Sequence, residues 1–293
     1  MNRGGVEHCP WAIAAAATFV AVQSWAPSRS APVPAPRKFL ASIGADASLQ
    51  TDRGAAALLS PDGTTLAFSA HQGGQTRLFI RKLDQLQAAP LAGTEGANYP
   101  FFSPDGQWLG FFADGKLKKA SVEGGAAVSL CDVEFGRGGT WADDDTIIFS
   151  PRSDNNTTLL RVPAAGGTPS AFGTLSQGAT TQRWPQALPG VKAVLYTENS
   201  NTTGFDGANI VVASLSADAS AKAGPAKVVV RGAYYGRFVP SGLATPKRAE
   251  REGGLLVRRH SGLRARRGDI QPLLSDRLAD ARWQDVRAAR DEG

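Results

Sequence analysis

The chain has 293 residues, with 32 Lys and Arg against 26 Asp and Glu for a net charge of +6, and 42% of its residues are hydrophobic. This length fits one large domain or two small ones, and the composition excludes wholesale disorder, a collagen-like repeat and a protein with many membrane spans. Three His and two Cys leave almost nothing for a soft-metal centre or a disulfide scaffold.

An apolar segment lies near the amino end. Residues 9–26 contain the run WAIAAAATFVAV, in which Thr18 is the only polar residue. From Trp11 to Trp25 a helix would span about 21 Å, against about 30 Å for the hydrocarbon core of a bilayer. Residues 1–26 are therefore predicted to form one apolar helix that contacts the membrane as an anchor. The alternatives are a secretory signal, cleaved before Ala31, and a buried helix.

A Pro-rich linker follows. Residues 27–54 lead into the first predicted strand, and the stretch APSRSAPVPAPRK at 26–38 contains four Pro, which favours an extended and semi-rigid spacer. The order of anchor, spacer and folded body predicts a single-pass cell-membrane protein with its body on the extracytoplasmic side. If the signal is cleaved instead, the body would be periplasmic or secreted.

A four-residue turn followed by an alternating strand recurs through residues 55–242. Ser60–Gly63 precedes TTLAFSA, and Ser103–Gly106 precedes QWLGFFA 43 residues later. Degraded copies are Ala142–Asp145 before TIIFS and Leu188–Gly190 before VKAVLYT, and a fifth copy begins at 239–242. These spacings of about 39 to 51 residues are typical of one four-stranded blade of a β-propeller.

The local chemistry of the repeat favours strands joined by tight turns. Pro fixes φ at the first turn position, Asp bonds its own backbone, and Gly tolerates the conformation that reverses the chain. Asp114–Gly115 and Glu123–Gly125 are further hairpin signals, and the alternating apolar residues predict that each sheet buries at least one face. The predicted fold is an all-β propeller of about four complete blades and the start of a fifth, after one apolar helix.

The pattern breaks after Gly242. An apolar alternating strand is expected there, but the chain reads LATPKRAEREGGLLVRRHSGLRARRGD, so no blade strand is predicted. Residues 243–293 carry twelve Lys or Arg against eight Asp or Glu, and are predicted to be a basic tail, partly disordered or helical. A truncated or frame-shifted chain is the favoured interpretation of the break, and a divergent genuine tail is the alternative.

Several sequence segments of the chain resemble those of a known family. YPFFSPDGQWLGFFADGKLKKASVEGGAAVSL and RWPQALPGVKAVLYT resemble WD40-like, TolB-like propeller repeats. Their sequences are similar to the carboxy-terminal sensor region of bacterial receptor-type serine/threonine protein kinases. In that family a kinase domain precedes an anchor, a Pro-rich spacer and the propeller. The chain has no Gly-rich nucleotide loop, no HRD-type loop and no DFG triplet, so no kinase residue is transferred to it.

The sequence offers little for catalysis. Beyond His8 it contains only His71 and His260, and it has no G-x-S-x-G elbow, so we predict no catalytic, cofactor-binding or metal-binding residue and no cofactor. Residues 55–242 show no cluster of Lys and Arg interleaved with aromatics, so no nucleic acid partner is expected. An alternative is the auxiliary propeller of a hydrolase or of a sugar-acting lyase whose catalytic partner is missing.

The best binding candidates come from aligning the repeats on their turns. The residues four to five places before each turn are Asn98, Tyr99, Arg137, Gly138, Arg183, Trp184, Tyr234 and Tyr235. We expect them to gather where the innermost strands begin, at one mouth of the propeller, although packing between blades is the alternative. Arg and large aromatics there favour an anionic or peptide ligand, held by stacking and charge-assisted bonds. The predicted function is a non-enzymatic binding module for a protein or small-molecule ligand.

Overall fold

The computed structural model describes the folded body of the chain. Backbone and side chains are described at residues 43–50, 57–152, 156–188, 193–200, 207–215 and 226–238, and the backbone alone at 204–206, 239–240, 253–259 and 262–266. The regular secondary structure of these residues consists of β-strands, which confirms the all-β prediction. The helix predicted at residues 1–26 lies outside these ranges. Within them, no helix has the length and apolar character needed to cross a membrane.

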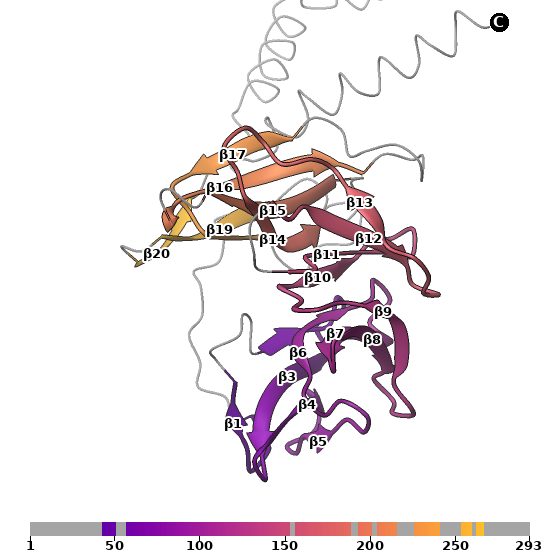
Figure 1. Cartoon of the computed structure of the whole chain (residues 1–293). Coiled ribbons are helices and arrows are strands. Elements are labelled where there is room, and N and C mark those ends of the chain that lie inside the picture. The colour runs from indigo at the N-terminus through magenta and orange to yellow at the C-terminus, as the bar shows by residue number, and fades with distance from the viewer. Residues whose placement is uncertain are drawn as a thin grey trace, which may run out of the picture. The chain divides into compact units, whose positions relative to one another are not determined.

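The described strands form five antiparallel sheets, which follow one another along the chain (Figure 1). The strands of the first sheet are β1 Ser48–Leu49, β2 Ala57–Leu59, β3 Thr65–Gln72, β4 Gln75–Lys82 and β5 Ala89–Pro90. Both β1 and β2 pair with β3, at Ala70 to His71 and at Leu66 to Phe68 respectively, so they occupy the same edge of this strand. The β1 strand falls in the segment predicted to lead into the propeller.

The next three sheets each have four strands in sequential order. They are β6 Asn98–Phe102, β7 Trp108–Ala113, β8 Lys116–Ser121 and β9 Val128–Asp132; β10 Gly139–Trp141, β11 Thr146–Phe149, β12 Leu159–Pro163 and β13 Ser170–Phe172; β14 Thr181–Ala187, β15 Ala193–Ser200, β16 Gly204–Ser214 and β17 Lys227–Arg231. This is the antiparallel four-stranded sheet that the sequence predicts for each complete repeat. The predicted strands TIIFS and LLRVP correspond to β11 and β12.

The fifth sheet corrects one prediction. Its strands are β18 Tyr235–Pro240, β19 Gly253–Arg259 and β20 Gly262–Arg266, and β19 pairs with both of the others. The expectation that no blade strand follows Gly242 is therefore wrong. The short run Leu255–Val257 supplies residues that favour a β-strand, but the Arg residues around it hide the alternating pattern in the sequence. The backbone still pairs with β18 by hydrogen bonds.

The recurring Ser-Pro-Asp-Gly turn is explained by its hydrogen bonds. In the second sheet the Ser103 hydroxyl donates to the Asp105 carboxylate and accepts from the Trp108 N–H at 2.9 Å, and Gly106 has a φ of +73°. The Ser103 hydrogen bond comes first among the causes that hold the pKa of Asp105 below its usual value. The hydroxyl and the carboxylate thus close the turn, and Gly alone adopts its last conformation without strain.

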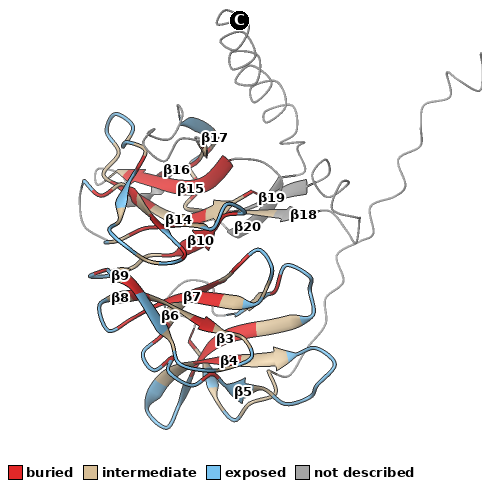
Figure 2. Ribbon diagram, turned by 90° about the vertical axis from the view of Figure 1, so that its right-hand side faces the viewer, coloured by how far each residue is buried: buried red, intermediate tan, exposed pale blue. Residues whose placement is uncertain are grey.

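Neighbouring sheets pack face to face through alternating apolar residues. In β11, Ile147 and Phe149 belong to the core shared with the second sheet, whereas Ile148 packs with residues of the fourth. Similar shared cores join the first sheet to the second and the fourth to Phe238 of the fifth. Figure 2 shows the buried residues along the middle of the strands and exposed residues in the loops. Both faces of the inner sheets are therefore buried.

Candidate functional site at the starts of the innermost strands

One group of residues lies where the first strands of the second to fifth sheets begin. These strands are β6, β10, β14 and β18. We use the name mouth site for Tyr99, Pro100, Arg137, Gly138, Gly139, Arg183, Trp184, Pro185, Tyr235 and Arg237. The group unites residues that are more than 130 positions apart in the sequence.

Two aromatic residues of the mouth site have an unusual backbone. Tyr99 and Trp184 both have a φ of +50°, and each is followed by Pro. In both strands the pairing register shifts at this point, as in a β-bulge. Pro has no N–H to give to the ladder, which suits an interrupted register. A left-handed conformation costs a bulky residue about 1 to 3 kcal/mol, and such outliers concentrate at functional sites.

The third sheet has glycine where its neighbours have these aromatics. Gly138 has a φ of +97°, and a Cβ placed on it would lie 3.1 Å from Trp184 Cα and 3.2 Å from Trp184 Cδ1. Any side chain at this position would be strained and would press on the tryptophan. The absence of a side chain at Gly138 therefore creates the space that Trp184 occupies.

Hydrogen bonds between sheets fix the positions of the strand starts. The Trp184 N–H donates to the Arg137 carbonyl at 3.1 Å, which links the fourth sheet to the third. The Gln186 side-chain amide donates to the Phe238 carbonyl at 3.1 Å and accepts from the Phe238 N–H at 2.8 Å. This paired contact joins the fourth sheet to the fifth. These hydrogen bonds thus hold the third, fourth and fifth sheets together at the mouth site.

A shallow hollow opens between these strands. Its lining residues are Tyr99, Pro100, Gly138, Gly139, Trp184, Pro185, Tyr235 and Arg237. Two of the rings support each other, because Trp184 and Tyr235 meet edge to face with their centroids 5.8 Å apart. The walls are therefore aromatic rings, proline rings and bare backbone.

Guanidinium groups stand at the same place. Arg137 Nη1 donates to the Tyr99 hydroxyl at 2.8 Å, and Arg237 Nε donates to the Tyr235 hydroxyl at 2.9 Å. No described Asp or Glu forms an ion pair with Arg137 or Arg237. Burial, and then the positive charge of Arg137, lower the pKa of Arg183, while Tyr99 opposes this shift. The mouth site carries crowded positive charge.

The predicted candidates divide into two groups. Tyr99, Trp184 and Tyr235 line the hollow. Arg137 donates a hydrogen bond to Tyr99, and the charge of Arg137 acts on Arg183. Two other candidates, Asn98 and Tyr234, are not among the residues that line the hollow. The Asn98 amide donates to the Gly96 carbonyl at 2.6 Å, and the Tyr234 carbonyl accepts from the Thr197 hydroxyl at 3.0 Å. The alternative role, packing between blades, also applies to Trp184, which contacts a neighbouring sheet.

Several residues of the mouth site were not predicted. Pro100 and Pro185 follow an aromatic at the same offset in two repeats, and this shared aromatic-Pro pair was a signal available in the sequence. Arg237 lies two residues beyond Tyr235, so alternation along a strand places both on one face. Gly139 gives no comparable signal, because its role depends on what a side chain there would meet, namely Phe101.

The chemistry of the mouth site is that of recognition. Guanidinium groups stay protonated at physiological pH and donate hydrogen bonds, and the rings offer faces for stacking. Among the described residues, no group of three or more His, Cys, Asp or Glu is placed to hold a metal ion. Cys131 lies away from this site, and burial, then Asp132, raise its pKa to about 11.

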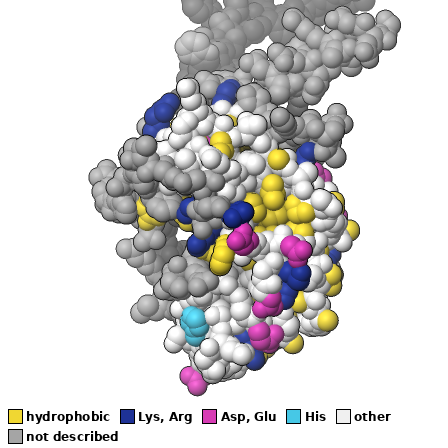
Figure 3. All heavy atoms as spheres, viewed as in Figure 1, with side chains coloured by type: hydrophobic (Ala, Val, Ile, Leu, Met, Phe, Trp, Pro, Cys, Tyr) yellow, Lys and Arg dark blue, Asp and Glu magenta, His cyan; other side chains and the backbone are white. Residues whose placement is uncertain are grey.

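Some charges elsewhere on the surface form ion pairs. Figure 3 shows one face of the molecule, on which basic and acidic side chains are intermixed. Exposed ion pairs join Lys82 to Glu123 at 3.2 Å and Arg152 to Glu134 at 3.1 Å. These pairs belong to an ordinary solvated surface, unlike the grouped arginines of the mouth site.

Comparison with known proteins identifies the fold. No family model and no curated protein matches the sequence. Among solved structures, TolB from Acinetobacter baumannii is similar at 14% identity and a TM-score of 0.53, over 72% of this chain and 53% of that one. Hydrazine synthase from Kuenenia stuttgartiensis is similar at 12% identity and a TM-score of 0.50, over 69% and 54%.

The chain spans about half the length of these two solved structures. At such low identity the similarity concerns the fold and carries no activity across. The chain has the fold of a TolB-like β-propeller.

Proposed function

We propose that this chain is a non-enzymatic β-propeller binding module, and that its ligand, a protein segment or a small molecule, is held at the mouth site. The observation that carries the proposal is the meeting of residues from four successive sheets around one hollow, with three aromatic rings and Arg237 in its lining and Arg137 bonded to Tyr99 beside it. Concave sites with rings and a few fixed polar groups are the usual form of a ligand pocket.

The backbone of the site supports this function. Tyr99 and Trp184 keep a left-handed conformation that costs free energy, and the surrounding sheets hold it in place. A site fixed before binding loses less conformational entropy when a ligand enters. The strained aromatics therefore fit a preorganised recognition surface better than simple packing, for which an ordinary strand conformation suffices.

The cellular setting of this module follows from the sequence. The apolar segment at residues 9–26 would anchor the propeller at the extracytoplasmic face of the cell membrane, or would direct its export if it is cleaved. The resemblance to the sensor region of receptor-type serine/threonine kinases fits a sensing role for the module. Both statements remain predictions from the sequence.

The proposal is tested with the full chain and a defined probe set in saturation-transfer NMR. The probes are hippurate, its neutral amide hippuramide, phenyl phosphate, and the tripeptide Ala-Ala-Phe with a free or amidated carboxyl terminus. At least one probe is expected to bind, and Tyr235→Ala to weaken it about 10-fold, as expected for the loss of an aromatic contact. Phe135→Ala is the matched control, because Phe135 is 64% exposed and lies outside the mouth site.

Two results would contradict the proposal. One is that none of the probes binds. The other is that Tyr235→Ala, shown by circular dichroism to keep its β-sheet spectrum, binds every probe as tightly as the unaltered chain.

A further inference from the structure

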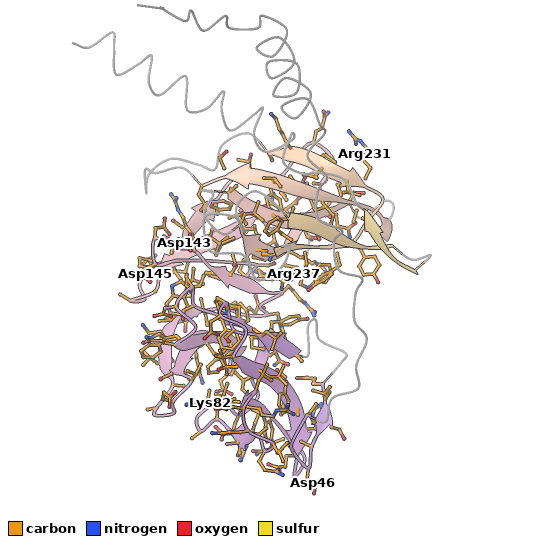
Figure 4. The ribbon with its side chains drawn as sticks, turned by 180° about the vertical axis from the view of Figure 1, so that it is seen from behind. Asp46, Lys82, Asp143, Asp145, Arg231 and Arg237 are labelled. Atoms are coloured by element: carbon orange, nitrogen blue, oxygen red, sulfur yellow. The ribbon has the colours of Figure 1, made fainter. Side chains whose placement is uncertain are left out.

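At the mouth site, Arg137 and Arg237 form no ion pair with a described Asp or Glu. Arg137 precedes β10, Arg183 lies in β14, and Arg237 lies in β18, so three adjacent sheets each contribute one guanidinium group. The described partners of Arg137 and Arg237 are the hydroxyls of Tyr99 and Tyr235, which carry no charge at neutral pH. Arg237 also lies over the Tyr235 ring at 5.6 Å and is labelled in Figure 4.

Half-buried like charges repel each other, and burial weakens the screening by water. Arg137 and Arg183 experience this repulsion, which lowers the pKa of Arg183 after the larger effect of burial. The Nε atom of Arg137 is also buried, with no hydrogen-bond partner among the described residues. An anion in the hollow, which Arg237 lines, would relieve the repulsion and accept hydrogen bonds from the Arg237 guanidinium group.

The walls of the hollow restrict the kind of anion. A guanidinium fork matches the two oxygens of a carboxylate in one plane. The aromatic and proline rings next to it suit an apolar body, and a singly charged group costs less to dehydrate beside them than a doubly charged phosphate. We infer that the mouth site binds a carboxylate, with the apolar part of the same ligand against Trp184 and Tyr235; this inference rests on the proposed function.

Two sources can supply such a carboxylate, and the probes separate them. Hippurate represents a small organic acid, and Ala-Ala-Phe with a free carboxyl terminus represents a peptide end. Each is compared with its own amide, which keeps the ring and the shape but removes the charge. Phenyl phosphate tests the competing anion. Dissociation constants are measured by isothermal titration calorimetry with the full chain at low and at physiological salt.

The acids are expected to bind at least about 10-fold more tightly than their amides, the loss typical of a charge-assisted hydrogen bond. Arg137→Gln and Arg237→Gln should each remove most of this difference, so that a folding defect in one variant leaves the other as a test. Arg183→Lys keeps the charge but loses the fork, and should weaken binding by a smaller factor. Arg231→Gln is the matched control, since Arg231 is an exposed arginine on the outer strand β17.

The outcomes are distinct. Tighter binding of hippurate or of the free tripeptide supports the inference and identifies the source. Equal affinity of acids and amides, tighter binding of phenyl phosphate, or no effect of either Gln variant would overturn it. If each acid binds no more tightly than its amide and Tyr235→Ala weakens the binding of both, the proposed function stands while the carboxylate inference fails. If no probe binds at all, both fail.

Discussion

In the part of the chain that the structure describes, cations meet aromatic rings at two places, and the two places differ in how the cation is partnered. At the first, which we name the lysine clip, Lys119 Nζ lies 4.8 Å from the Trp108 ring centroid and 5.8 Å from that of Trp141, and donates to the Ala164 carbonyl at 2.8 Å. The clip joins the second sheet to the third. At the mouth site Arg137 and Arg237 donate to hydroxyl groups, and Arg183 lies near the positive charge of Arg137.

The comparison shows that a cation beside aromatic rings does not by itself mark a binding site. One ammonium between two rings, with a carbonyl as acceptor, is a completed contact that holds two sheets together. Two guanidinium groups close together repel each other, and an anion beside them would reduce that repulsion. The lysine clip is therefore structural, and the mouth site is the candidate for a ligand.

The largest expected effect is a difference in lost stability between Trp141 of the lysine clip and Trp184 of the mouth site. Trp141 is 7% exposed and donates from its indole to Asp145, so Trp141→Ala should lower the free energy of unfolding by about 3 to 5 kcal/mol. Trp184 is half-buried, and Trp184→Ala should cost about 1 to 1.5 kcal/mol while abolishing probe binding. Urea denaturation measures both. Equal losses of stability would remove the distinction.

The next effect tests the lysine clip alone. Lys119→Met keeps the apolar stem but removes the charge and the donor, so the free energy of unfolding should fall by about 1 to 2 kcal/mol. Lys82→Met is the control, because it breaks an exposed ion pair with Glu123 and should cost less than about 1 kcal/mol. If both variants melt at the same temperature as the unaltered chain, the clip contributes nothing.

A smaller effect of opposite sign is expected at the mouth site. Without ligand, Arg183→Gln removes a like charge beside Arg137, so the free energy of unfolding should rise by about 0.5 kcal/mol at low ionic strength. The gain should shrink in 0.5 M salt, where screening already weakens the repulsion. Thermal unfolding at the two salt concentrations measures it. A loss of stability at both would show that Arg183 serves the framework.

The smallest effect concerns the turn that links the two places, since Ser103–Gly106 connects β6 to Trp108. The pKa of Asp105 is lowered in the folded chain, so its contribution is present above the ordinary value of 3.8 and is lost as the pH falls through the lowered one. Asp105→Asn should remove less than about 0.5 kcal/mol at pH 6, and the difference should shrink as the pH falls through the lowered pKa. A constant difference across this range, followed by chemical denaturation, would contradict the assignment.

Much of the fold was available in the sequence, because its determinants are local. The Ser-Pro-Asp-Gly turns and the alternating strands TIIFS and LLRVP act over a few residues, and they correspond to the turns and strands of the structure. The same reasoning failed at β19, where Leu255–Val257 was too short a run to stand out among arginines. There the pairing with β18, and not the pattern, decides that a strand forms.

The candidate site required more than local information. Alignment of the repeats predicted that Tyr99, Trp184 and Tyr235 belong together, but it also selected their neighbours Asn98 and Tyr234, which do not line the hollow. Adjacent residues of a strand point to opposite faces, so a difference of one position decides between hollow and framework. The hollow itself, its bulged aromatics and the role of Arg237 depend on how neighbouring sheets pack. The sequence alone thus determined the repeats and their turns, whereas tertiary packing decided which side chains meet, because those contacts join residues far apart in the chain.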